Sequence, residues 1–132
     1  MLKAYWENQK GENQFPAPDD ILPENIEQIW PSCFIAEAGN GKFLYSHFGE
    51  QMLLAYAKDM HSENIVDDTL YPESPEFIHK LLEVMNTKEP LTYDGAFINF
   101  DNQDIKFRKI LLPLGDGEIV THVLGGMLWQ KF

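Results

Sequence analysis

The sequence predicts an α+β fold with a single antiparallel sheet, and three observations support this prediction. Two apolar segments of strand length, 105–114 and 119–129, are joined by a Gly-Asp-Gly turn, which is a strong hairpin signal. Two shorter β-rich segments, 33–38 and 43–48, lie much earlier in the chain. Helical patterns fill the region between the two pairs. This order is typical of one sheet that the helices cover.

The amino-terminal segment is predicted to be a short helix. Leu2, Tyr5 and Trp6 recur at helical spacing, and Gly11 ends the pattern. The aromatic side chains need a surface that covers them. That surface is either the chain's own sheet or a second copy of the chain.

A second short helix of about two turns is predicted over residues 23–30. Pro23 suits a first helical turn, and Pro31 stops the helix. We therefore divide the chain into an N-terminal helical extension, residues 1–31, and one globular domain, residues 32–132. A chain of this length can bury a core without a disulfide or a metal.

The first hairpin is predicted at segments 33–38 and 43–48, around a Gly-Asn-Gly-Lys turn. Alternation along its second strand places Phe43, Tyr45 and His47 on one face. His47 is then either an imidazole in the interior, where an unperturbed pKa of about 6.5 permits a charge change, or a hydrogen-bonded histidine on the outer face.

Two helices are predicted between the strand pairs. The first covers residues 49–57 and buries Met52, Leu53 and Tyr56. The second covers residues 75–87 and is the clearest helix of the chain. Its apolar stripe, which we expect to be buried, comprises Ile78, Leu81, Leu82 and Met85.

The segment 91–100 is rich in Thr, Tyr, Phe and Ile, and we predict it as the third strand of the sheet. Gly95 interrupts this segment and indicates either a bulge or a close backbone approach. Gly125 and Gly126 lie inside the last strand, where they indicate either a bulge or a close-packing site.

The charge balance argues against one class of partner. Ten basic and 21 acidic residues give a formal net charge of −11. Such a chain repels phosphate backbones and lacks the Lys/Arg cluster of a nucleic-acid-binding protein. The single cysteine, Cys33, excludes an internal disulfide and is expected to be a small buried hydrophobe. Because no apolar run is long enough for a signal peptide or a membrane span, we expect a cytoplasmic protein.

No motif for catalysis or metal binding is present in the sequence. His61, Glu63, Asp67 and Asp68 are conceivable metal ligands, but their spacing matches no zinc or calcium motif, and solvation in a polar loop is the simpler interpretation. The serines lack a Gly-x-Ser-x-Gly elbow, and no Gly-rich phosphate loop occurs. We predict no catalytic residue, no metal and no enzymatic activity.

Dispersed positions of the chain resemble a known family. They are the Tyr-Trp pair at 5–6, the run from Pro-Ala-Pro to Phe-Ile-Ala-Glu at 16–37, the Phe-Leu-Tyr at 43–45 and the Leu-Leu-Pro-Leu at 111–114. Over nearly its whole length the chain resembles small bacterial PAS-domain proteins of the stand-alone kind. It departs from the pattern at Ser46, where the family tends to have an arginine.

The resemblance implies a five-stranded antiparallel sheet with helices across one face and a pocket between the two. PAS domains use this pocket for small ligands, flavin or haem, and use the outer sheet face and flanking helices for dimerisation. By the resemblance, Tyr5 and Trp6 are expected at a homodimer interface. The residues expected to line the pocket are Tyr45, His47, Met52, Tyr56, Ile78 and Leu82.

Neither haem nor flavin is supported by a specific motif, so the cofactor is unknown. Some haem-binding PAS domains take an axial histidine from the long helix, where this chain has His79. Helical geometry turns that side chain away from the buried stripe and toward solvent. Flavin photochemistry would need a cysteine in an Asn-Cys-Arg-type helix motif, whereas Cys33 starts a strand.

The predicted function is that of a non-enzymatic sensory module in signal transduction. It would regulate a separate effector protein through protein–protein contact, gated by a small ligand in the pocket. One alternative is a small enzyme on a cone-shaped fold of the nuclear-transport-factor type with an Asp-His pocket. Another is a purely structural dimerisation domain. A cavity lined by the expected pocket residues would favour sensing, and a solid aromatic interior would favour the structural role.

Overall fold

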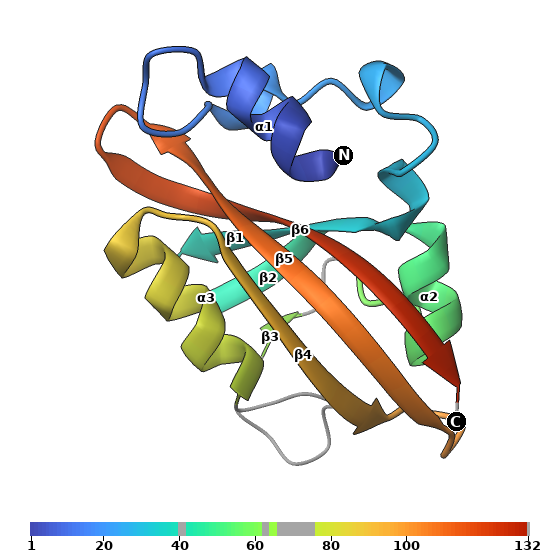
Figure 1. Cartoon of the computed structure of the whole chain (residues 1–132). Coiled ribbons are helices and arrows are strands. Elements are labelled where there is room, and N and C mark those ends of the chain that lie inside the picture. Colours follow the sequence, from blue (N-terminus) through green and yellow to red (C-terminus); the bar gives the residue numbers. More distant parts are fainter. Residues whose placement is uncertain (40–41, 62–63, 66–75, 132) are drawn as a thin grey trace.

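A computed structural model describes residues 1–39, 42–61, 64–65 and 76–131 of the chain. The strands form one antiparallel sheet in the order β3-β2-β1-β6-β5-β4 (Figure 1). Their bounds are Cys33–Gly39 (β1), Lys42–Phe48 (β2), Asn64–Ile65 (β3), Leu91–Ile98 (β4), Asp104–Asp116 (β5) and Ile119–Lys131 (β6). The predicted five-stranded antiparallel sheet is confirmed, and the two-residue strand β3 extends it at one edge.

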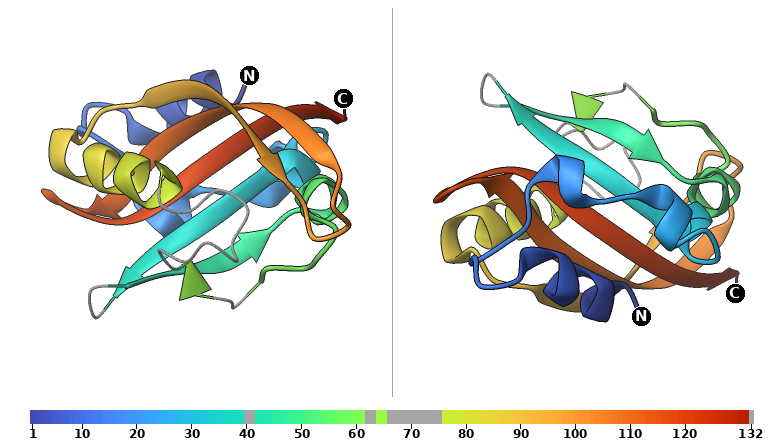
Figure 2. Two further views of the ribbon diagram at one scale, coloured as in Figure 1. Left: turned by 90° about the horizontal axis from the view of Figure 1, so that it is seen from below. Right: turned by 90° about the horizontal axis from the view of Figure 1, so that it is seen from above.

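Helical elements cover both faces of this sheet. On the outer face lie α1 and three short 3₁₀ turns, and on the inner face lie α2 and α3 (Figure 2). The helix bounds are Leu2–Lys10 (α1), Glu50–Tyr56 (α2) and Glu76–Thr87 (α3), and the 3₁₀ turns are Pro18–Asp20, Pro23–Asn25 and Trp30–Ser32. The predicted helical extension therefore exists and packs on the sheet. The division of the chain at residue 31 stays a prediction.

The predicted two-turn helix over residues 23–30 is wrong. The turn that Pro23 begins ends at Asn25, and a separate turn starts at Trp30. Ile26 leaves helical geometry with φ −134°, because its buried side chain packs on the sheet. Prolines that bracket so short a segment leave too few residues to offset the cost of helix nucleation.

Two groups of buried side chains lie on opposite sides of the sheet. The inner core fills the space between the sheet and the helices α2 and α3. The outer core fixes α1 and the 3₁₀ turns to β5 and β6. The inner core includes Phe34, Tyr45, Phe48, Tyr56, Phe77, Phe97 and Phe107, and the outer core includes Leu2, Trp6, Phe15, Cys33, Leu112 and Leu124.

A β-bulge in the first hairpin changes which face His47 occupies. Ile35 pairs with His47 and Ala36 pairs with Tyr45, so Ser46 is the extra residue of β2. Because the bulge breaks the alternation, Tyr45 points into the inner core while His47 lies on the outer face against Trp30. The predicted sharing of one face by Tyr45 and His47 is therefore wrong.

The buried stripes of the two inner helices differ in part from the predicted ones. In α2, Ala55 is buried in place of Leu53, which is 38% exposed. In α3, the buried residues are Phe77, Leu81 and Val84, which lie four and three residues apart on one face. Leu82 falls beside that face and is 45% exposed.

Candidate functional site

The inner core contains a buried lysine. Ile105, Phe107, Lys109 and Leu111 point inward from alternate positions of β5, and all four are nearly or fully buried. Lys109 is 0% exposed, although lysine is among the residues least often buried. A charged group in this position indicates a specialised environment rather than ordinary packing.

Four aromatic rings surround the ammonium group of Lys109, and we call them the aromatic cage. The Lys109 Nζ atom lies 3.9 Å from the ring centroid of Phe77 and 4.9 Å from that of Phe107. The corresponding distances to Phe34 and Tyr56 are 5.6 Å and 5.9 Å. All four lie within the range of cation–π attraction, which is strongest where water is excluded.

Tyr56 also supplies a polar contact inside the aromatic cage. The Lys109 Nζ donates a hydrogen bond of 3.2 Å to the Tyr56 hydroxyl oxygen. Tyr56 is the last residue of α2 and is 1% exposed. The site can thus stabilise a cation through ring faces and a hydroxyl acceptor together.

Two glycines make room for two rings of the aromatic cage. A Cβ atom on Gly125 would lie 2.0 Å from Cζ of Phe34, and a Cβ atom on Gly95 would lie 2.5 Å from Cζ of Phe107. Close packing, one of the two interpretations of Gly125, is confirmed, whereas the group that approaches Gly95 is the side chain of Phe107 and not the backbone that was predicted. Phe34 and Phe107 therefore lie flat over the backbone of neighbouring strands, which turns their ring faces toward Lys109.

The residues predicted to line a pocket do not all come together. Tyr45, Met52 and Tyr56 are at most 2% exposed in the inner core, and Ile78 packs on that core from its edge. Two others lie elsewhere, since Leu82 is exposed on α3 and His47 is on the outer face. In the described part of the chain the interior is occupied by side chains.

Aromatic contacts fill the space that the pocket was expected to occupy. The ring centroids of Tyr45 and Phe48 are 4.8 Å apart, and those of Phe34 and Phe77 are 5.6 Å apart. Tyr56 stands in the same row, 4.8 Å from Phe97. Edge-to-face and tilted contacts of this kind are typical of a packed core.

Lys109 was absent from the set of residues predicted from sequence. The signal that could have revealed it is its position in the alternation of β5, between the inward residues Phe107 and Leu111. A lysine in register with apolar neighbours on a covered face has to be buried. The identity of the cage residues depends on long-range pairing and could not be read from local pattern.

His47 has an unusual environment on the outer face. Its ring stacks on Trp30, with centroids 4.0 Å apart and planes 13° apart. The His47 Nε2 atom is buried and has no hydrogen-bond partner among the described residues. Burial lowers the pKa of His47 below its ordinary value, opposed in part by a hydrogen bond to the backbone of Trp30.

The two aromatic residues predicted at a homodimer interface pack within the chain. Trp6 is 3% exposed, and its indole Nε1 donates a hydrogen bond of 2.8 Å to the carbonyl oxygen of Pro113. The Tyr5 hydroxyl accepts a hydrogen bond of 2.8 Å from the backbone N–H of Leu22. Both residues therefore pack within their own chain, in the outer core. Their role in a dimer stays a prediction.

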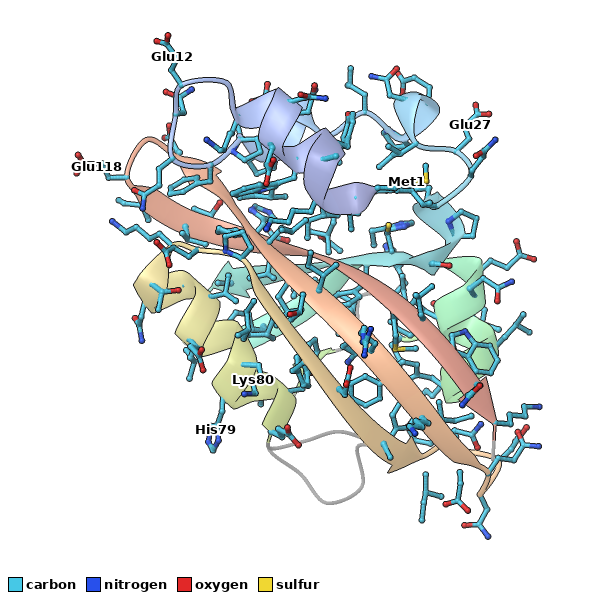
Figure 3. The ribbon with its side chains drawn as sticks, viewed as in Figure 1. Met1, Glu12, Glu27, His79, Lys80 and Glu118 are labelled. Carbon is cyan, nitrogen blue, oxygen red and sulfur yellow. The ribbon has the colours of Figure 1, made fainter. Side chains whose placement is uncertain are left out.

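The remaining candidate residues have ordinary surroundings. His79 points into solvent from α3 (Figure 3), as its helical position predicted. Cys33 is 1% exposed, and burial raises the pKa of its thiol to about 12, which makes it an inert core residue.

The described residues contain no cluster of three potential metal ligands. The suggested ligands Glu63, Asp67 and Asp68 lie outside the described residues.

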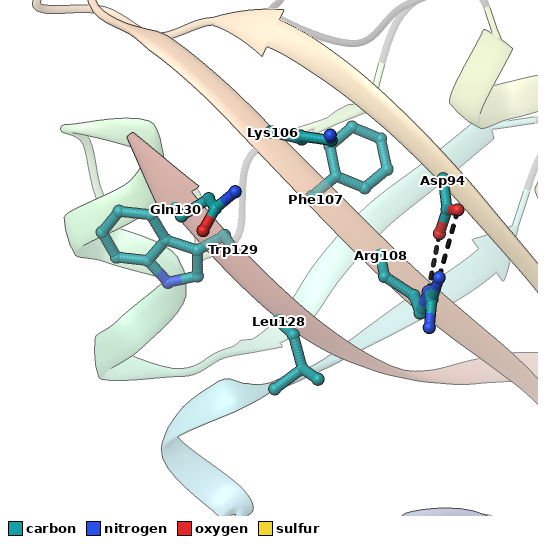
Figure 4. A pocket seen from close by; sticks show the side chains of 7 residues that line it. All are labelled: Asp94, Lys106, Phe107, Arg108, Leu128, Trp129 and Gln130. Atoms are coloured by element: carbon teal, nitrogen blue, oxygen red, sulfur yellow. Dashed lines mark hydrogen bonds and ion pairs between the residues drawn. The ribbon is translucent and has the colours of Figure 1, made fainter. Parts of the chain in front are cut away.

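Two hollows lie on the exposed half of the outer face. One is a shallow hollow of about 360 Å³ beside the ion pair of Arg108 and Asp94, whose Nε and Oδ1 atoms are 2.8 Å apart (Figure 4). The hydrogen bond from Arg108 lowers the pKa of the Asp94 carboxyl. The second is a larger apolar groove next to α1, which shares Arg108 and Leu128 with the first.

The inner core does not fit flavin photochemistry through a cysteine. Cys33, the single cysteine of the chain, belongs to the outer core on the opposite side of the sheet from the aromatic cage. His79 points away from the inner core, so it does not offer haem an axial ligand there. The Lys109 ammonium and the Tyr56 hydroxyl are two polar groups that meet inside the inner core.

Comparison with known proteins identifies the fold. A family model described as "PAS domain" matches residues 1–128. A light-oxygen-voltage domain studied with a flavin analogue is 15% identical, with a TM-score of 0.62 and coverage of 83% of this chain and 82% of that chain. A light-oxygen-voltage protein of Rhodobacter sphaeroides is 7% identical, with a TM-score of 0.59 and coverage of 83% and 68%.

A further structural neighbour is an RNA-binding light-oxygen-voltage receptor, which is 13% identical with a TM-score of 0.62. The match covers 84% of this chain and 33% of that receptor. No curated protein sequence matches the chain. Within the described residues, no helix is both long and apolar enough to cross a membrane.

Proposed function

The chain belongs to the PAS domain family, and from this premise we propose that it is a non-enzymatic sensory module that regulates a separate effector protein by direct contact. The proposal extends to gating by a small ligand in the interior. The structural neighbours support the fold, and the regulatory role is inferred from the family.

The observation that carries the proposal is the position of Lys109. The aromatic cage takes one ring from each of β1, α2, α3 and β5. A ligand that displaces or pairs with the Lys109 ammonium has to move these rings, because the core around them is close-packed. A local change in charge would thereby alter the packing of both inner helices against the sheet.

The filled interior favours one alternative, a structural contact domain without a ligand. The inner core is occupied by aromatic side chains in the described residues, and a solid core of this kind needs no small molecule. In that case the effector contact would be constitutive. Ligand gating requires a ligand to displace the Lys109 ammonium from the aromatic cage or to pair with it. In a structural contact domain the ammonium would keep its contacts with the cage rings.

Native mass spectrometry after exposure to a small-molecule extract tests the ligand-gated function. We expect a bound small molecule on the wild-type protein and its loss in Lys109→Met, which keeps an unbranched side chain of similar volume but removes the charge. Lys106→Met is the matched control, since Lys106 lies three positions away on the exposed face of the same strand. Equal binding by both variants, or no bound molecule on any protein, would contradict gating and favour the filled contact domain.

A further inference from the structure

An apolar groove of about 510 Å³ lies on the outer face of the sheet, at the place where the cover formed by α1 ends, and we call it the outer groove. Its volume is in the range typical of small-molecule sites. Its apolar lining includes Met1, Leu2, Ile29, Ile110 and Leu128. The outer groove opens on the face of the sheet opposite the aromatic cage, and Lys109 and Met127 of β5 and β6 are among the residues that line it.

Gly126 is one of the residues that line the outer groove. Gly126 of β6 pairs with Ile110 of β5. A Cβ atom on Gly126 would meet Cδ2 of Leu2 at 3.0 Å and Cγ2 of Ile110 at 3.4 Å. Because Gly126 has no side chain, Leu2 of α1 packs directly against the backbone of β6 at this position, and Gly126 lines the outer groove beside it.

One end of the outer groove carries a cation. Arg108, the one arginine of the chain, lies two positions before Ile110 on the same face of β5 and pairs across the strands with Leu128. Asp94 fixes the guanidinium through Nε and Nη2, at 2.8 Å and 3.4 Å. The ion pair does not use Nη1, whose N–H groups can donate to a second acceptor at the end of the groove.

The charges around the outer groove point to one class of occupant. Apolar walls bury hydrocarbon, while a guanidinium held at the end selects a carboxylate. We propose that the outer groove binds an aliphatic carboxylate, with its alkyl chain between Leu2, Ile29 and Ile110 and its carboxylate at Arg108. This site is separate from the interior and stands whether or not the interior takes a ligand.

Titration with hexanoate, heptanoate and octanoate, followed by the amide NMR signals of Gly126 and Ile110, tests the proposal. We expect saturable shifts and an affinity that rises about fourfold for each methylene buried. Octan-1-ol should bind more weakly than octanoate, and octylammonium more weakly still, because Arg108 repels a cation. Shifts that do not saturate, or an affinity independent of chain length, would overturn the proposal.

Two matched variants locate the binding. Leu128→Asp removes an apolar wall and adds a repelling charge, whereas Ile98→Asp makes the same kind of change at an exposed position of β4 that lines neither hollow. We expect octanoate binding to be lost in the first and retained in the second. Arg108→Gln should weaken octanoate binding about tenfold and leave octan-1-ol unchanged.

Other occupants give distinct results. Sedimentation of the wild-type protein as a dimer that Leu128→Asp dissociates, without octanoate binding, would assign the outer groove to a second copy and overturn the proposal. Equal loss of binding in Leu128→Asp and Ile98→Asp, with both variants folded by circular dichroism, would also overturn it. Selective loss in Leu128→Asp, together with the chain-length dependence, would support it.

Discussion

Replacing Gly125 with alanine tests how the aromatic cage is assembled. The new Cβ atom would lie 2.0 Å, 2.2 Å and 2.6 Å from three carbon atoms of the Phe34 ring. These separations are far below van der Waals contact, so the fully buried ring has to leave its position. Overpacking of a core costs about 1 to 3 kcal/mol, and we expect Gly125→Ala to lie at the upper end of that range.

The double variant with Phe34→Leu shows whether that clash is the cause. Leucine lacks the ring atoms that the new Cβ would meet, so Gly125→Ala should cost about 1 to 2 kcal/mol less in the Phe34→Leu background than in the wild type. Urea unfolding at equilibrium measures the four free energies of unfolding, provided that the m-values agree.

Gly39→Ala is the control, because a Cβ at Gly39 meets nothing within 4 Å. We expect this variant to lie within about 0.5 kcal/mol of the wild type. Additive effects of Gly125→Ala and Phe34→Leu, within about 0.5 kcal/mol, would refute the reasoning. They would mean that the Phe34 ring does not lie over Gly125.

Three further predictions concern other parts of the molecule. Trp6→Ala should lower the free energy of unfolding by about 3 to 5 kcal/mol, because it empties a buried site and removes the bond to Pro113, and unchanged urea stability would contradict this. Lys109→Ala should cost about 2 to 5 kcal/mol and Lys109→Met clearly less, since methionine refills the space; equal costs in urea would count against close packing around the side chain. The folded pKa of His47 is lowered, so its neutral form contributes stability that is present above about pH 6.5 and is lost as the pH falls through the folded pKa. His47→Phe should flatten that dependence in urea midpoints measured from pH 7.5 to 5, and an unchanged profile would assign the dependence to other groups.

The sequence was most informative where local pattern and tertiary packing agree. The hairpin of β5 and β6 was predicted from its turn and its apolar strands, and both strands were found at those positions with slightly wider bounds. The long inner helix α3 was predicted equally well, because its apolar residues recur at helical spacing. Gly125 was interpreted as either a bulge or a close-packing site, and it is closely packed against the Phe34 ring.

The predictions of which side chains are buried failed where tertiary contacts, and not the local spacing of apolar residues, decide the face on which a side chain lies. A single extra residue, Ser46, moved His47 to the opposite face from the predicted one, and strict alternation cannot reveal such a bulge. Leu82 is as apolar as Leu81, and only the packing of Phe77 and Val84 on the sheet decides which of the two is buried. Lys109 was missed because polarity alone suggests exposure, while its register on a covered strand requires burial.

Side-chain NMR of Lys109 tests the central claim, that its ammonium lies inside a cage of aromatic rings. The Lys109 ε-methylene protons should resonate well upfield of those of the other lysines, because four ring faces surround them, and should show nuclear Overhauser effects to the ring protons of Phe77 and Phe107. An ε-methylene signal that coincides with those of exposed lysines and lacks any such effect would contradict the account.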